Sequence, residues 1–138
     1  MSDRDPDCLF CKIVAGEVPA TIVDEDEHTV SFMDINPATT GHALIVPRKH
    51  AVDLFDIERA ELEAVAVAAQ RLAKRALERL GADGVNLLNS SRPAAWQTVF
   101  HFHFHLIPRY IDDPLRLPWI PGPGDPAAIA DAAARLRG

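Results

Sequence analysis

The stretch VFHFHFHLI, residues 99–107, places a histidine at every second position from 101 to 105. Side chains on a β-strand alternate between its two faces, so this period predicts a strand with the three histidines on one face. The other face would carry Phe100, Phe102, Phe104 and Leu106. Burial of four large apolar groups would fix the register of the strand and hold the histidine face outward.

The spacing limits what the three histidines can do together. At about 3.3 Å per residue, His101 and His103 lie roughly 6.6 Å apart, and His101 and His105 about 13 Å apart. Two neighbours could share a metal ion, whose bonds to nitrogen are about 2.0–2.1 Å long, but three on a flat strand could not. We therefore expect the histidines to have different roles. The alternative is a half-buried strand whose polar face merely happens to consist of histidines.

Composition and charge exclude several classes of protein. The chain has 138 residues, of which 48% are hydrophobic and 25% charged, which is typical of one globular domain. A net charge of -6, with no basic cluster beyond Arg48-Lys49, argues against a nucleic-acid groove. Residues 1–7 contain no apolar run and no stretch approaches a membrane span, so we expect no signal peptide and a cytoplasmic location.

The two cysteines form the motif Cys8-Leu9-Phe10-Cys11. In a reducing compartment a lasting disulfide is disfavoured, which leaves a metal site, a redox pair or two inert thiols. A redox pair of the thioredoxin kind would follow a strand inside a βαβ unit, and this motif lies too near the start of the chain. A tetrahedral zinc site would need two further ligands, which His50 or a histidine of the 101–105 stretch could supply.

The remaining patterns predict an α+β fold in which an antiparallel sheet of about five strands packs with one long helix. We expect a short helix or turn over residues 12–19, a hairpin of strands 21–23 and 29–33, and strands over 42–47 and 85–89. Apolar residues recur at helical spacing from 56 to 80, and Gly81 ends that helix. Five prolines between 114 and 126 predict irregular structure, followed by a short C-terminal helix over 127–136. We expect one domain, 1–138, with a core of about 8–110 and a proline-rich tail and C-terminal helix over 111–138.

The pattern from His101 to Ile107 resembles the signature of the histidine-triad (HIT) superfamily of nucleotide hydrolases and transferases. Further segments resemble that family in its order, so the resemblance covers about residues 8–110. It is closest to the bacterial Hint-like branch, in which Cys-x-x-Cys near the start is common. Residues 93–96 depart from the pattern, because many relatives carry glycine-rich residues there. The matching segments are FMDINP (32–37), GHALIVPRKH (41–50), Asn89, QTV (97–99) and PR (108–109).

The resemblance implies a catalytic role for the middle histidine. His103 would attack the α-phosphorus of a nucleotide and form a covalent nucleotidyl-histidine, from which water releases the nucleoside monophosphate. A neutral imidazole needs no separate base, provided that its other nitrogen is held by an acceptor. His105 would stabilise charge on the phosphate oxygens, and Gln97 and Thr98 would bond the phosphate or leaving group. His42 would support the triad.

The resemblance also implies a nucleotide site and a closed zinc site. Asp34 would accept hydrogen bonds from the ribose hydroxyls, and Asn89 would belong to the same site. Zinc would be structural, because two sulfurs and two nitrogens complete its tetrahedron. The residues implied around the base are Leu9, Phe10, Ile13, Val18, Phe32 and Ile35; the zinc ligands are Cys8, Cys11, His50 and His101.

The expected activity is hydrolysis of purine nucleotide conjugates, with adenosine phosphoramidates or acyl-adenylates first and diadenosine polyphosphates second. A homodimer is expected, as is usual in the family. A nucleotidyl transferase of the galactose-1-phosphate type is disfavoured because those chains are longer. Two other classes stay open: a zinc hydrolase in which His101 and His103 hold a catalytic metal with an open position, and a nucleotide-binding or interaction module.

Overall fold

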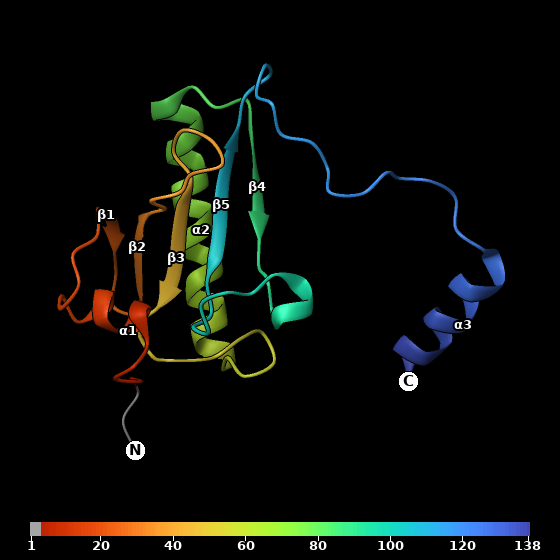
Figure 1. Cartoon of the computed structure of the whole chain (residues 1–138), viewed down its shortest axis with the longest axis horizontal. Coiled ribbons are helices and arrows are strands. Elements are labelled where there is room, and N and C mark those ends of the chain that lie inside the picture. Colours follow the sequence, from red (N-terminus) through yellow and green to blue (C-terminus); the bar gives the residue numbers. More distant parts are fainter. Residues whose placement is uncertain (1–3) are drawn as a thin grey trace.

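A computed structural model of the chain describes residues 4–138 (Figure 1). Residues 1–3, part of the opening stretch in which we expect no signal peptide, lie outside the described residues. Among the described residues, no helix combines the length and the apolar character needed to cross a bilayer. The elements are α1 (Leu9–Val14), β1 (Ile22–Glu25), β2 (Thr29–Met33), β3 (Ala43–Pro47), α2 (Arg59–Leu80), β4 (Gly84–Leu88), a 3-10 turn (Pro93–Ala95), β5 (Phe104–Arg109) and α3 (Pro126–Arg137).

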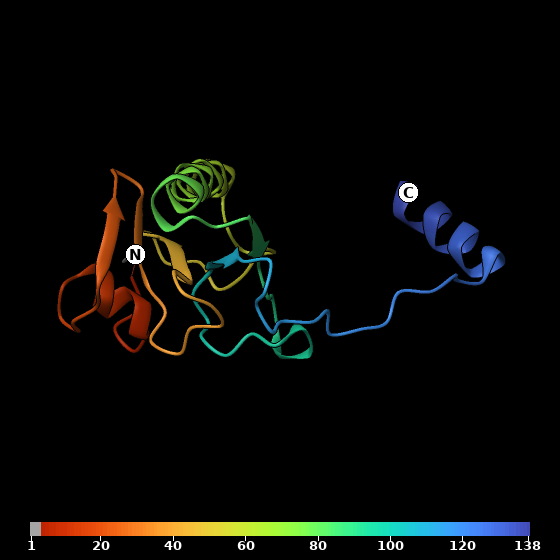
Figure 2. The same cartoon turned by 90° about the horizontal axis from the view of Figure 1, so that it is seen from above.

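The five strands form one antiparallel sheet in the order β1-β2-β3-β5-β4, and α2 crosses one of its faces (Figure 2). The predicted α+β class, the strand number, the long helix and the C-terminal helix are confirmed. The short helix begins earlier than predicted, at Leu9, because Cys8 caps it: its sulfur accepts from the Cys11 N–H at 3.4 Å.

The core lies between α2 and the central strands. Small side chains on the inward face of α2 let the helix approach the sheet closely, where Phe102 and Ile45 are fully buried. Gly81 ends the helix in a left-handed conformation with φ of 68°, which favours glycine. The inward residues of α2 are Val65, Ala68, Ala69, Leu72 and Ala76.

The histidine stretch is a strand only in its second half, which corrects the prediction of one strand over 99–107. β5 begins at Phe104, and the residues before it leave the sheet. The Phe102 N–H donates to the Ala51 carbonyl at 2.7 Å, outside any ladder. His101 reaches the Pro47 carbonyl with its side chain instead of its backbone. Phe100, predicted on the buried face, is therefore 48% exposed.

Candidate functional site

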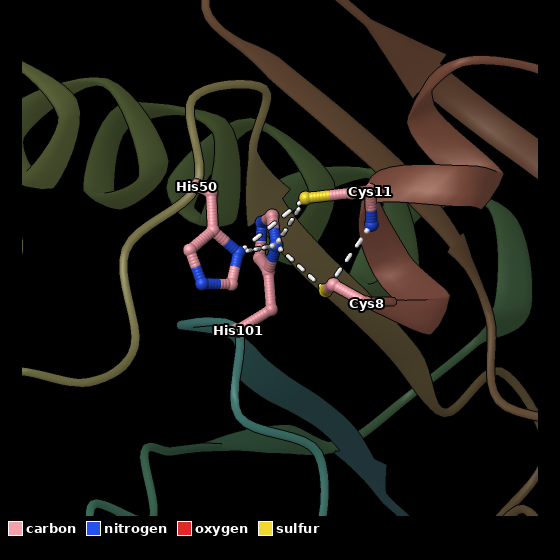
Figure 3. A group of neighbouring side chains, drawn as sticks. All are labelled: Cys8, Cys11, His50 and His101. Carbon is pink, nitrogen blue, oxygen red and sulfur yellow. Dashed lines mark hydrogen bonds between the residues drawn. The ribbon is translucent and has the colours of Figure 1, made fainter. Parts of the chain in front are cut away.

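Two cysteines and two histidines converge where α1, the segment after β3 and the segment before β5 meet (Figure 3). The four ligand atoms all lie within 4.8 Å of one another. The Nδ1 atom of His101 is 3.4 Å from Cys8 Sγ, 3.5 Å from Cys11 Sγ and 3.2 Å from His50 Nδ1. Cys11 Sγ is also 3.4 Å from His50 Nδ1. The structure thus brings together all four residues that the family resemblance assigned to zinc.

This cysteine–histidine cluster has the donor chemistry of a tetrahedral metal site. Bonds of about 2.0–2.1 Å to nitrogen and 2.3 Å to sulfur give tetrahedral edges of roughly 3.3–3.8 Å. The His101 Nε2–H donates to the Pro47 carbonyl at 2.8 Å, so its Nδ1 carries the free lone pair. Burial lowers the pKa of His101 to about 4 and raises that of the Cys11 thiol to about 11. A cation would reverse the second effect, because metal coordination deprotonates a thiol.

A cavity of about 390 Å³ opens between α1, β2 and the end of the histidine stretch. His103 and His105 form part of its wall, and Asp34 lies on the same wall. Leu44 and Val99 also line it, although neither was predicted to contact a base. The predicted site residues that line this cavity are Leu9, Phe10, Ile13, Val18, Phe32, Asp34, Ile35, Thr98, His103 and His105.

Hydrogen bonding fixes the tautomer of His103. Its Nδ1 lies 2.7 Å from the His101 carbonyl oxygen, which can only accept, so Nδ1 carries the proton and Nε2 the lone pair. The ring is 5% exposed, and the Phe10 ring meets it edge-on with centroids 5.1 Å apart. Burial lowers the pKa of His103 below its ordinary value. At neutral pH the imidazole is therefore unprotonated at one fixed nitrogen.

The same argument gives His105 the opposite tautomer. The Ala38 N–H donates to His42 Nδ1 at 2.9 Å, so the proton of His42 is on Nε2. That Nε2–H lies 3.0 Å from His105 Nδ1 and 3.4 Å from Asp34 Oδ2. His105 therefore accepts at Nδ1 and carries its own proton on Nε2. Burial lowers the pKa of His42 and lowers that of His105 to about 4, so both rings are neutral.

Asp34, His42 and His105 also lie close enough to suggest a metal site, with ligand atoms within 4.8 Å of one another. The tautomer argues against it. Because the Ala38 N–H occupies His42 Nδ1, the nitrogen that faces the other two residues bears a proton and offers no lone pair. Asp34 Oδ1 accepts from the Asn36 N–H at 2.8 Å, which leaves Oδ2 for the histidines. This group is a hydrogen-bond relay, and we call it the relay cluster.

The side chains of Gln97 and Asn89 form hydrogen bonds with backbone groups. The buried Gln97 amide donates to the Val52 carbonyl at 2.7 Å, and its oxygen accepts from the Arg92 N–H at 2.6 Å. Asn89 donates to the His103 carbonyl at 3.0 Å. Neither residue lines the cavity, but each bonds the backbone of a residue that does: Asn89 that of His103, and Gln97 that of Val99, whose carbonyl accepts from Gln97 Nε2 at 3.2 Å. Sequence reasoning missed the Pro47 carbonyl and the Ala38 N–H, because a backbone group gives no residue-type signal.

Comparisons with known proteins agree with this arrangement. The HIT domain profile matches residues 15–112. A structure of SMU.412c from Streptococcus mutans is 34% identical and aligns over 99% of this chain and 87% of its own, with a TM-score of 0.92. A Zn-bound histidine triad family protein from Mycobacterium smegmatis is 40% identical over 95% of this chain and 96% of its own, with a TM-score of 0.78. A histidine triad nucleotide-binding protein from Candida albicans is 31% identical over 95% of both chains, with a TM-score of 0.82. The extent of the profile match and the agreement of the whole fold establish that this chain belongs to the HIT domain family.

Proposed function

We propose that the protein hydrolyses the bond between the α-phosphate of a purine nucleotide and its leaving group, through a covalent nucleotidyl-His103. One observation carries the proposal: His103 and His105, side by side on one cavity wall, are held in opposite tautomers. Their ring centroids are 4.9 Å apart. A lone pair and an N–H donor are thereby presented together, which is what an attack on a charged phosphate needs.

The first step forms one bond and breaks another. The Nε2 lone pair of His103 attacks the α-phosphorus, and the phosphorus–nitrogen or phosphorus–oxygen bond to the leaving group breaks. The leaving group departs with the electron pair of that bond and takes up a proton from solvent. As charge passes to the ring, the His101 carbonyl stabilises the Nδ1–H at 2.7 Å. Water then attacks the same phosphorus and loses a proton to solvent, the bond from phosphorus to Nε2 breaks with its electron pair returning to His103, and the nucleoside monophosphate is released.

The neighbouring groups support this step by donating hydrogen bonds and fixing orientation. The His105 Nε2–H would donate to a phosphate oxygen, and His42 keeps that proton in place by occupying His105 Nδ1. The Thr98 hydroxyl, which lines the same cavity, would bond the phosphate or the leaving group. Gln97 and Asn89 would act through the backbone they hold, as positioning residues.

The apolar part of the cavity suits a purine base, and Asp34 suits the ribose hydroxyls. The Phe10 and Phe32 rings meet edge-on at 5.3 Å and close one side of it. Asp34 lines the same cavity, and its carboxylate would accept hydrogen bonds from the ribose hydroxyls. The nucleotide-binding relative from Candida albicans supports this assignment. Adenosine phosphoramidates or acyl-adenylates are the first substrate class, and diadenosine polyphosphates are the second.

We further propose that Cys8, Cys11, His50 and His101 hold a structural zinc ion. When bound, zinc would supply a cross-link between α1 and the segment that carries His103. The Zn-bound relative from Mycobacterium smegmatis supports this. Four protein ligands leave no open position, and His103 lies outside the set, so the geometry favours this reading over a catalytic zinc held by His101 and His103. A homodimer in the cytoplasm is proposed from the family resemblance.

The test is to mix the purified protein with an adenosine phosphoramidate, quench, and search by mass spectrometry for an adenylyl adduct. We expect the adduct on His103 and a loss of activity on the order of 1,000-fold or more in His103→Ala. His28→Ala is the matched control, because His28 is exposed and does not line the cavity. Turnover without an adduct, abolished by a chelator, would favour a zinc hydrolase. Nucleotide binding without turnover would favour a binding module.

A further inference from the structure

A second cavity, of about 410 Å³, opens between the C-terminal half of α2 and the sheet. Consecutive residues of β3 and β5 divide between the two cavities. Ala43 and Leu106 line the second, whereas their neighbours Leu44 and His105 line the one that contains His103. Because successive side chains of a strand point to opposite faces, the second cavity lies behind the sheet, on the side that α2 covers (Figure 2). We call it the α2 pocket; its apolar lining includes Val23, Ala43, Leu72, Ala76, Leu80 and Leu106.

The α2 pocket is a recess with a buried floor and an exposed rim. Leu72 and Leu106 at its floor are 8% and 2% exposed, whereas Val23 and Leu80 are 40% and 47% exposed. The backbone of Gly41 packs directly against the rim, because its φ is 93° and an added Cβ would collide with Leu80 Cδ1. The volume falls within the range of small-molecule sites, roughly 300–1,000 Å³. A recess of this shape suits the end of a slender ligand better than the flat surface of another protein.

Three arginines follow one another at a spacing of four residues on α2, which places them along one face of the helix. Arg71 bonds Asp24 and Asp26 at 2.6 and 2.8 Å. Arg75, which lines the α2 pocket, bonds the other oxygen of Asp24 at 2.9 Å. Arg79 also lines the pocket, and it has no ion pair or side-chain hydrogen bond within residues 4–138. The two carboxylates are thus shared by the first two arginines, and the third presents its charge at the pocket without a partner.

The side chains that line the α2 pocket indicate the chemistry of its ligand. None of the described residues in the lining is acidic, so the site does not suit a cation. None of them is aromatic, so a base would have no ring to stack on, and Thr40 alone among them offers a hydroxyl, which is too little to hold a sugar. Aliphatic walls suit an alkyl chain, and a guanidinium can bind both oxygens of a carboxylate. We propose that the α2 pocket binds an alkyl carboxylate, with its chain between α2 and the sheet and its carboxylate on Arg79.

Methyl NMR of the full chain, titrated with decanoate below its micelle-forming concentration, tests the proposal. We expect saturable shifts of the methyl signals of Leu72 and Leu106, which line the α2 pocket. The methyl signals of Ile13 and Val18, which line the cavity on the other face of the sheet, should not move. This readout needs no substrate, so its result is independent of the reaction proposed for His103.

The variant Arg79→Ala separates the charge from the apolar contacts. We expect the Kd for decanoate to rise about 5- to 10-fold, because a charge-assisted pair is lost. Decanol, which has the same chain without the carboxylate, should bind both proteins equally. Arg59→Ala is the matched control, because Arg59 is an exposed arginine of the same helix that does not line the pocket. Added salt should weaken the binding of decanoate and not that of decanol.

Any of four results would overturn the proposal. They are the absence of saturable shifts at the α2 pocket, shifts confined to Ile13 and Val18, decanol that binds the unmodified protein as tightly as decanoate, and a Kd for decanoate that Arg79→Ala leaves unchanged. Because Arg79 is exposed, its replacement should leave the thermal midpoint of the free protein unchanged. Weaker binding by this variant therefore reports the lost charge and not a loss of fold.

Discussion

The cysteine–histidine cluster and the relay cluster take their histidines from the same short stretch, yet they present opposite chemistry. The His101 Nε2–H donates a hydrogen bond to a carbonyl, so Nδ1 faces two sulfurs and a second imidazole with its lone pair. His105 instead faces the protonated nitrogen of His42. Four electron-pair donors that face one another can bind a cation. The alternating donors and acceptors of the relay cluster instead keep the proton of His105 on its Nε2. In each histidine, the partner of one ring nitrogen determines whether the other nitrogen carries a lone pair or a proton.

The largest effect should come from breaking the cysteine–histidine cluster. We expect Cys11→Ser to abolish metal binding and to lower the free energy of unfolding on the order of 5 kcal/mol, because the metal would join segments far apart in sequence. The thermal midpoint should fall by about 10 °C or more. Metal content per chain by plasma mass spectrometry and thermal melting provide the measurements. A chelator on the unmodified protein should reproduce the loss; full metal content in the variant would refute the ligand assignment.

A smaller and separable effect should come from the relay cluster. His42→Ala leaves His105 Nδ1 without its donor, so the His105 proton is no longer held on the cavity side. We expect kcat/KM to fall about 10- to 100-fold, the usual cost of losing a residue that orients a functional group. Metal content should stay at the level of the unmodified protein. Loss of metal in this variant would mean that the two clusters are one cooperative unit.

The smallest effect should be a shift of the acid limb of the pH profile of kcat/KM. It follows from the lowered pKa values of the histidines in the relay cluster. Burial lowers the pKa of His105 from its ordinary 6.5 to about 4 and lowers that of His42. Between pH 4 and pH 6.5 the unfolded chain therefore binds more protons than the folded one. The stabilisation is therefore complete above pH 6.5 and is lost as pH falls towards 4. The acid limb of kcat/KM should lie below pH 6.5, checked by circular dichroism at each pH. A limb centred at 6.5 or above would contradict a buried, neutral relay.

The family resemblance predicted the composition of the cysteine–histidine cluster better than the residue pattern predicted the path of the chain that forms it. Alternation correctly marked β5 and the burial of Phe102, but it also extended the strand back through Phe100. A period of two reports which residues alternate, and it cannot report where backbone pairing stops. Here pairing stops because the Phe102 N–H turns to Ala51, outside the sheet. The tautomers of His101 and His42 could not be predicted either. They are set by the Pro47 carbonyl and the Ala38 N–H, and a backbone group gives no signal in the sequence.

The residues around the cavity could also be predicted only in part. The family resemblance named most of its lining, because Leu9, Phe10 and Ile13 lie in a segment with a recognisable pattern. The resemblance also placed Gln97 at the phosphate. In the structure its side chain forms hydrogen bonds with the backbone of Val52 and Arg92. An amide that bonds a ligand and one that bonds a loop look identical in sequence. Only the three-dimensional path of the loop over 90–98 distinguishes them.

The single turn and a half of α1 has a thermodynamic consequence. Cys8 and Cys11 face the cysteine–histidine cluster, while Leu9, Phe10 and Ile13, interleaved with them, line the cavity. One short rigid element is thus shared by two binding sites. Linkage requires that any factor by which a bound metal changes the affinity for a nucleotide equals the factor by which the nucleotide changes the affinity for the metal. If a metal holds α1 in the orientation that the cavity needs, nucleotide affinity will depend on metal supply, and a bound nucleotide will raise the affinity for the metal by the same factor.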